Sequence, residues 1–401
     1  MSLTEASESA SEPERIHRPD YRGGGIVNLM SSIVRGLGGQ ESLYPSCPAL
    51  PPARLRAPRS VALLVIDGLG YEFLQRHGQG TRLLEHTAAR LSSVFPSTTA
   101  TAITSFLTGT APQQHGLTGW HMYLKELGCV MAVLPGQARF GGGGLSEARI
   151  EARQLLSHRS IFERIAVQSY SVVPAHIARS DFNIAHQGPA ELRSYQTLDE
   201  YFGIIERLLR QGNHRQFVYA YWPELDRLAH EHGTASPQVL AHLKALDAAF
   251  ARFLDRIAGS DALIALSADH GFIDTPPEHA IELDDHPRLR DTLLLPLCGE
   301  RRAAYCYVGA ERRADFEAYI HNELGHGIEL RRTSELIEQG WFGLGEPHPR
   351  LRERAGDYVL LMKDDYIIKD WLVGERRYSQ IGVHGGVSSA EMFVPLILAE
   401  A

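Results

Sequence analysis

The sequence predicts a doubly wound α/β fold with a mostly parallel central sheet, and two patterns lead to this prediction. Residues 60–66 read SVALLVI, a continuous aliphatic run that suits a strand buried on both faces of a parallel sheet. Further short apolar runs alternate with helical patterns along most of the chain, as in α/β proteins. Hydrophobic residues make up 44% of the 401, so the chain can bury the core that such a sheet needs.

The expected elements follow one another in a simple order. A short helix within residues 25–39 ends at Gly38 and Gly39, and a Pro-rich connection at 44–58 leads to the first strand. The other strands are expected at residues 91–95, 170–174, 217–222, 261–267 and 393–399, and helices at 98–107 and 237–257.

Residues 276–374 have a different pattern and are predicted to form a smaller inserted α+β cap. Short strands and helices mix there, at residues 303–308, 311–323, 333–339 and 358–362. The catalytic α/β core would then comprise residues 26–275 and 375–401. Residues 1–25 are polar and are expected to form a disordered tail.

Composition limits the class of protein. The net charge of −8 argues against a protein that coats nucleic acid, whereas a small anionic substrate is compatible with it because bound metal ions reverse the local charge. Four scattered cysteines predict neither a disulfide framework nor a cysteine zinc site. With no apolar signal stretch or membrane-length run, we expect a cytoplasmic protein, although a mature form trimmed of its signal would look the same.

Residues that bind metal ions gather at the expected strand ends. In open α/β sheets, ligands bind where the strands end, and here carboxylates and imidazoles follow three strands and precede a fourth. A single Asp in such a place is often only a helix cap, but mixed Asp and His side chains at four strand ends suit zinc or a similar transition metal. The candidate ligands are Asp67, Asp226, His230, Asp269, His270 and His384.

A nucleophile is expected at the start of the helix over residues 98–107. Ser97, Thr98 and Thr99 follow Pro96, and a helix N-terminus suits phosphate because of its free N–H groups and positive dipole end. A metal ion would activate a threonine hydroxyl by lowering its pKa. The alternative is an ordinary N-cap, for which serine and threonine are preferred.

Five motifs in this order resemble the nucleotide pyrophosphatase/phosphodiesterase branch of the alkaline-phosphatase superfamily, over roughly residues 60–400. The matching pieces are VIDGLG (65–70), FPSTT…FLTG (95–109), LDRLAHEHG (225–233), ADHG (268–271) and GVHGG (382–386). The resemblance implies a small phosphate-ester substrate, two divalent metal ions, with zinc the first choice and manganese or iron as alternatives, and a phospho-threonine intermediate. It implies Asp67, Thr99, Asp269 and His270 as ligands of one ion, Asp226, His230 and His384 as ligands of the other, and Thr99 as nucleophile.

The chain departs from the resembled family at two positions. Ala100 stands where nucleotide-hydrolysing relatives often have an aromatic residue, and Trp120 stands near the place of an asparagine that helps to bind phosphate. These differences put nucleotide specificity in doubt and leave the metal ligands untouched. No sulfatase motif follows Pro96, where the sequence reads STTAT.

The sequence favours phosphodiesters over monoesters, because residues 92–120 contain no Lys or Arg to neutralise a dianionic phosphate. Distant cations such as Arg179 or Lys369 would weaken this argument if they folded over the site. The alternatives are a phosphomonoesterase or phosphonate hydrolase with the same two-metal site and, less favoured, a non-catalytic metal-stabilised binding protein. The sequence does not indicate an oligomeric state.

Overall fold

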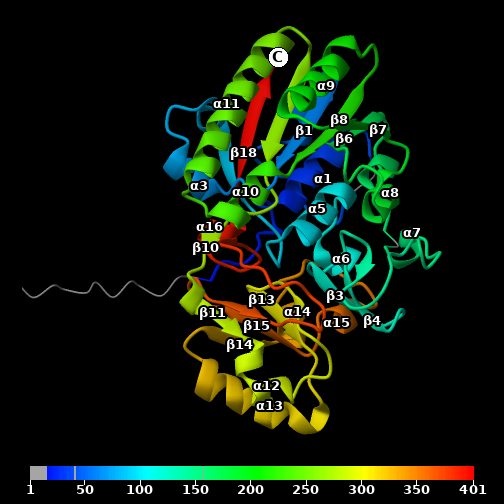
Figure 1. The fold of residues 1–401 in the computed structure, drawn as a ribbon. Helices are drawn as coiled ribbons and strands as arrows, with labels where there is room; N and C mark the ends of the chain where they lie inside the picture. The colour runs from blue at the N-terminus through cyan, green and yellow to red at the C-terminus, as the bar shows by residue number, and fades with distance from the viewer. Residues whose placement is uncertain (1–15, 40–41, 157) are drawn as a thin grey trace, which may run out of the picture.

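The predicted fold class is confirmed by the computed structural model, which describes residues 16–39, 42–156 and 158–401 (Figure 1). A seven-stranded sheet forms the centre of the larger part. In spatial order its strands are β2 (Thr87–Ser92), β18 (Phe393–Glu400), β9 (Ala262–Ser267), β1 (Ser60–Ile66), β8 (Gln216–Trp222), β6 (Gln168–Pro174) and β7 (Glu191–Tyr195). Strands β9, β1, β8, β6 and β7 run parallel, and β18 pairs antiparallel with β9 and β2.

Helices pack around this sheet (Figure 1). Helix α1 (Ile26–Gly36) contacts α5 (Thr99–Thr108), and α9 (Leu198–Gln211) contacts α11 (Pro237–Ile257). The other helices of this part are α2 (Pro52–Arg56), α3 (Tyr71–His77), α4 (Arg82–Glu85), α6 (Pro112–His115), α7 (Ala152–Leu155), α8 (Asp181–Gln187), α10 (Glu224–His232) and α16 (Ser389–Met392). All seven residues of β1 and of β8 are buried, which accounts for their uninterrupted apolar sequences.

A second seven-stranded sheet forms the smaller part and is drawn below the first in Figure 1. Its strands in spatial order are β14 (Ile328–Arg332), β15 (Tyr358–Met362), β13 (Ala303–Cys306), β12 (Cys298–Gly299), β3 (His121–Leu124), β4 (Cys129–Ala132) and β5 (Gln137–Ala138). Its pairings are antiparallel. The helices of this part are α12 (Pro287–Arg290), α13 (Arg313–Tyr319), α14 (Thr333–Glu338) and α15 (Leu351–Arg354).

The cap therefore differs from the expected insertion of residues 276–374, because β3, β4 and β5 add residues 121–138 to its sheet. Gly299 on β12 pairs with His121 on β3, which joins two segments far apart in the sequence. The insertion leaves and re-enters the core through a short antiparallel pair, β10 (Ile273–Asp274) and β17 (Gly382–Val383). A parallel pair, β11 (Ala280–Glu282) and β16 (Ile367–Lys369), lies inside the insertion.

The expectation of a disordered tail over residues 1–25 is wrong for residues 16–25, which are packed against the fold. The backbone N–H of His17 donates to Val387. Tyr21 is buried, and its hydroxyl donates to the backbone oxygen of Trp341. An aromatic residue within a polar stretch provides the apolar surface that anchors it. Residues 1–15 lie outside the described part of the chain. In the part described, no helix is long and apolar enough to cross a membrane.

A buried ion pair joins the cap to the core. Arg302, just before β13, donates from Nε and Nη2 to the two carboxylate oxygens of Glu391 in α16, at 3.1 and 2.9 Å. Both side chains are almost fully buried. Burial alone would raise the pKa of Glu391, but Arg302 beside it holds that pKa below its usual value. Glu391 also accepts from the backbone N–H of Gly386, so the pair fixes the loop that carries His384.

We expect Arg302→Ala to lower the free energy of unfolding by about 3–5 kcal/mol, because it leaves a buried carboxylate without its partner. The control is Arg54→Ala, which breaks an exposed pair with Glu400 and should cost less than about 1 kcal/mol. Denaturant titration of both variants measures the difference. Similar small losses in the two variants would contradict the coupling of cap and core through Arg302.

Candidate active site

The parallel register of the large sheet brings three aspartates to one edge. Asp67 directly follows β1, and its backbone N–H donates to Trp222, the last residue of β8. Asp269 lies two residues beyond β9, and its Oδ1 accepts from the backbone N–H of Gly68 at 3.1 Å. Asp226 lies in the first turn of α10, shortly after β8. The carboxyl ends of three neighbouring strands thus supply all three carboxylates.

Three histidines complete the cluster. His230 follows Asp226 by one helical turn on α10, and its Nε2 lies 3.4 Å from Asp226 Oδ1. His384, in the loop after β17, places Nε2 3.7 Å from the same oxygen. His270 Nε2 lies 3.4 Å from Asp67 Oδ1 and 3.4 Å from Asp269 Oδ2. The six Asp and His side chains that the sequence predicted as ligands therefore lie together in one cluster.

Two overlapping sets of donors could each hold a metal ion. In each set the ligand atoms lie within 4.8 Å of one another. The sets are Asp226, His230 and His384, and Asp67, Asp226 and His270. Asp226 belongs to both, so its carboxylate lies between the two groups.

Hydrogen bonds to the backbone orient two of the imidazoles. His230 Nδ1 lies 2.8 Å from the carbonyl oxygen of Gly382, and His270 Nδ1 lies 3.1 Å from that of Gly271. When Nδ1–H donates to a carbonyl, the Nε2 lone pair is free for a metal ion. The β10–β17 pairing beside Gly382 thereby helps to set the ring of His230.

Burial makes this cluster costly without a cation. In the described chain, Asp67 Oδ1, Asp226 Oδ1, Asp269 Oδ2 and His384 Nδ1 are buried polar atoms without a hydrogen-bond partner. Burial, together with the charges of Asp226 and Asp269, raises the pKa of Asp67 well above its usual value. Burial also raises the pKa of Asp226, and burial beside His270 and His230 lowers the pKa of His384 well below the ordinary value. Neutral imidazoles and unpaired carboxylate oxygens are the donors that zinc prefers, so the residues fit a metal site.

The two neighbouring threonines have different environments. Thr99 is the first residue of α5, and its Oγ1 lies 3.1 Å from His270 Nε2, beside the cluster. Thr98 is the N-cap, but its side chain does not cap the helix. Its hydroxyl donates instead to Glu300 Oε1 at 2.8 Å. The ordinary capping interpretation thus fails for both side chains, and only Thr99 faces the cluster.

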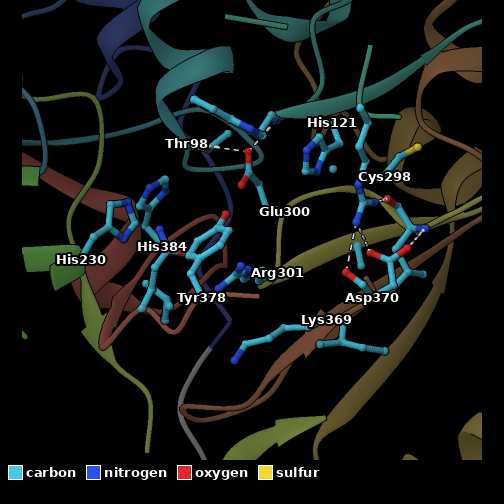
Figure 2. A pocket seen from close by; sticks show the side chains of 18 of the residues that line it. Thr98, His121, His230, Cys298, Glu300, Arg301, Lys369, Asp370, Tyr378 and His384 are labelled. Carbon is cyan, nitrogen blue, oxygen red and sulfur yellow. Dashed lines mark hydrogen bonds and ion pairs between the residues drawn. The ribbon is translucent and has the colours of Figure 1, made fainter. Parts of the chain in front are cut away.

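A cavity of about 440 Å³ extends from this cluster to the cap (Figure 2). Sequence reasoning missed most of its far wall, including Glu300, which accepts from the backbone N–H of Trp120 at 2.7 Å. Burial raises the pKa of Glu300 to about 7. The lining residues from the cap are His121, Arg139, Leu297, Cys298, Gly299, Glu300, Arg301, Ala304, Ile368, Lys369, Asp370 and Trp371. No local motif marks these residues, because they meet only when β3, β12 and β16 come together.

Comparison with known proteins gives a family and a fold. The family model described as type I phosphodiesterase / nucleotide pyrophosphatase matches residues 61–387. Murine ectonucleotide pyrophosphatase / phosphodiesterase 5 superimposes with a TM-score of 0.64 at 15% identity, over 84% of this chain and 87% of that chain. Phosphonoacetate hydrolase from Sinorhizobium meliloti 1021, in complex with phosphonoformate, gives 0.63 at 16% identity, over 85% and 90%. A comparison with curated protein sequences found no match.

The fold and the cluster define a phosphoester hydrolase of the alkaline-phosphatase superfamily, a class that is typically metal-dependent. Within it, the chain belongs to the type I phosphodiesterase / nucleotide pyrophosphatase family. The resemblance stated from the five sequence motifs is confirmed.

We expect Zn²⁺ to stabilise protein that has first been treated with a chelator, because it binds the folded cluster. At a hundredfold excess over Kd the gain is about 2.7 kcal/mol, seen as a rise in Tm. Asp226→Asn should lose most of this gain, since Asp226 belongs to both donor sets. The control Asp199→Asn changes a carboxylate that is 91% exposed and should keep it. An equal Tm rise in both variants would argue against the cluster as the metal site.

Proposed function

We propose that the protein is a two-metal phosphodiesterase or pyrophosphatase that acts through a phospho-threonine intermediate on Thr99. The observation that carries the proposal is a cluster of six ligand-type side chains, one of which, His270, lies 3.1 Å from the hydroxyl of Thr99 at the start of α5. Family membership supports the reaction class. A solved structure of an inactive threonine-to-alanine variant of the murine relative, in complex with AMP, supports a threonine as the reactive residue.

In this proposal the two ions are divalent, with zinc first and manganese or iron as alternatives. Asp67, Thr99, Asp269 and His270 would hold one ion, and Asp226, His230 and His384 would hold the other. When bound, such ions lower the pKa of a coordinated hydroxyl and stabilise charge on attacking and leaving oxygens.

Residues of this chain then take part in two displacements at phosphorus. Thr99 Oγ1 attacks phosphorus as the bond to the leaving oxygen breaks, which gives the phospho-threonine. Water attacks that phosphorus next, and the bond to Thr99 breaks. The start of α5 favours negative charge on the phosphoryl group, because the positive end of the helix dipole lies there. Two in-line displacements would retain configuration at phosphorus.

A phosphonate hydrolase is the second candidate. It is favoured by cationic side chains on the cap wall, namely Arg301 and Lys369, and by the likeness to phosphonoacetate hydrolase. A phosphomonoesterase with the same site remains the further alternative. A non-catalytic binding protein is less well supported, because such a protein has no need of a hydroxyl placed 3.1 Å from His270.

Thr99→Ala should lower kcat by about 10³-fold or more while metal content changes little, because it removes the nucleophile and keeps six other ligands. Thr98→Ala is the matched control, since it removes a neighbouring hydroxyl that donates to Glu300 instead. It should retain most of the activity. Steady-state kinetics with elemental analysis measure both variants. An inactive Thr98 variant beside an active Thr99 variant would assign the nucleophile to Thr98.

Phosphodiesters should be hydrolysed in preference to monoesters, because residues 92–120 around Thr99 offer no Lys or Arg to a second phosphate charge. Lys369 lines the same cavity from the cap, so the comparison also tests whether it serves that charge. The measurement compares kcat/KM for bis-(p-nitrophenyl) phosphate and p-nitrophenyl phosphate on one preparation. A preference of about tenfold for the monoester, or about 1.4 kcal/mol, would favour the phosphomonoesterase instead. In that case the cap cations would be serving the phosphoryl group itself.

A further inference from the structure

The cavity wall opposite the ligand cluster carries cationic side chains that differ in how closely carboxylates pair with them. Arg139 is neutralised, because its guanidinium pairs with Asp370 at 2.7 Å and with Glu375 at 2.9 Å. Lys369 is nearly buried, and among the described residues its ion-pair partner is Glu282 at 3.6 Å, which is beyond a good hydrogen bond. Arg301 lines the same cavity. The carboxylates thus lie beside Arg139 and Lys369, and Arg301 is left without one at close range.

Arg301 has no close carboxylate partner. No carboxylate in the described residues lies within 4 Å of its guanidinium nitrogens, and its Nη1 is buried without a hydrogen-bond partner. Burial lowers the pKa of Arg301, and the charges of Tyr378, Glu282 and Glu300 act in the opposite direction. A partly buried guanidinium without a close anion is unfavourable, because lost hydration is not replaced. We therefore expect the anion that pairs with Arg301 to be part of a bound ligand.

Aromatic rings hold the Arg301 guanidinium in place. Its central carbon lies 4.6 Å from the ring centroid of Tyr378 and 5.5 Å from that of Trp371. Figure 2 shows Arg301 beside Tyr378, with His384 on one side and Lys369 on the other. Cation–π contacts restrain the planar fork while leaving its N–H donors available. Arg301 is thus placed between the catalytic cluster and the second cation.

Glu300, the nearest acidic side chain in sequence, does not neutralise Arg301. Its Oε1 accepts from Thr98, at the start of the core helix α5, and from the N–H of Trp120, just before β3. Burial raises the pKa of Glu300 to about 7, so its carboxyl carries less than a full charge near neutral pH.

We propose that Arg301, assisted by Lys369, binds a second anionic group, a carboxylate or a phosphate, on the leaving-group side of the substrate. The inference rests on the proposed function, because Thr99 and the cluster fix where phosphorus lies. The planar guanidinium matches the paired oxygens of either anion, and Lys369 adds a point charge. The substrate class is therefore a phosphate ester, anhydride or phosphonate that carries another negative charge on the cap side.

The test measures binding of matched probes to the metal-loaded protein by calorimetry. The probes are phenylphosphonates that carry a meta carboxymethyl, carboxamidomethyl or phosphonomethyl group. The carboxamide has the shape of the carboxylate without its charge. We expect the carboxylate or the phosphonomethyl probe to bind at least tenfold more tightly than the carboxamide. Whichever anionic probe binds more tightly identifies the anion as carboxylate-like or phosphate-like.

Variants assign the effect to Arg301. Arg301→Gln should abolish the preference for the anionic probes and change carboxamide binding by less than about threefold. Arg301→Lys should restore part of the preference, because it keeps the charge without the fork. The control Arg76→Gln removes an exposed arginine that does not line the cavity and should leave the preference unchanged. Thermal unfolding confirms that each variant is folded.

The outcomes separate this inference from the proposed function. Equal affinity for charged and uncharged probes, or equal weakening of both by Arg301→Gln, would overturn the subsite. Hydrolysis of methyl phenyl phosphodiesters with the same three meta groups is measured in parallel. If none is hydrolysed while the Arg301-dependent preference persists in binding, the subsite stands and the diesterase proposal fails.

Discussion

Three carboxylates, those of the buried Asp67 and Asp269 and the half-buried Asp226, meet at one edge of the large sheet, and their repulsion is the constraint on which the site depends. The parallel pairing of β1 with β8 and β9 brings them to that edge. Part of the charge is met locally, since Tyr221 donates its hydroxyl to Asp67 and a backbone N–H donates to Asp269. The remaining oxygens call for a cation, and the surrounding imidazoles are further donors that could hold one.

The start of α5 explains why the two adjacent threonines differ. Thr99 lies at the first position of α5, where the helix start turns its hydroxyl toward His270. Thr98 precedes the helix with an extended backbone, so its hydroxyl reaches the cap residue Glu300 instead. Thr99 therefore faces the ligand cluster of the core, and Thr98 belongs to the contact between core and cap.

Core and cap each supply one side of the cavity. The core provides the ligand cluster and Thr99, while the cap provides a wall with Glu300, Arg301 and Lys369. The Arg302–Glu391 pair fixes the distance between the two, because Glu391 also holds the backbone of the loop after His384. A change in the cap would thus alter substrate choice with the metal ligands left in place. One fold can thus serve different activities, as the similar structures of a nucleotide pyrophosphatase / phosphodiesterase and a phosphonoacetate hydrolase illustrate.

The sequence by itself predicted the large sheet, apart from β7, and the side chains that gather at its edge, for physical reasons that are local. A strand buried on both faces needs an unbroken aliphatic run such as residues 60–66, and the rule that ligands gather at strand ends leads from there to Asp67 and Asp269. The one-turn spacing of Asp226 and His230 similarly places both on one side of a helix.

Only the tertiary structure decided how the cap is built and which of its side chains line the cavity. Residues 121–138 join its sheet by pairing with residues far along the chain, and local periodicity carries no sign of that. Arg301 and Arg302 are adjacent and chemically identical, yet one pairs with Glu391 and the other lines the cavity. Both lie in the turn between β12 and β13, so their different fates depend on how that turn is oriented between cap and core.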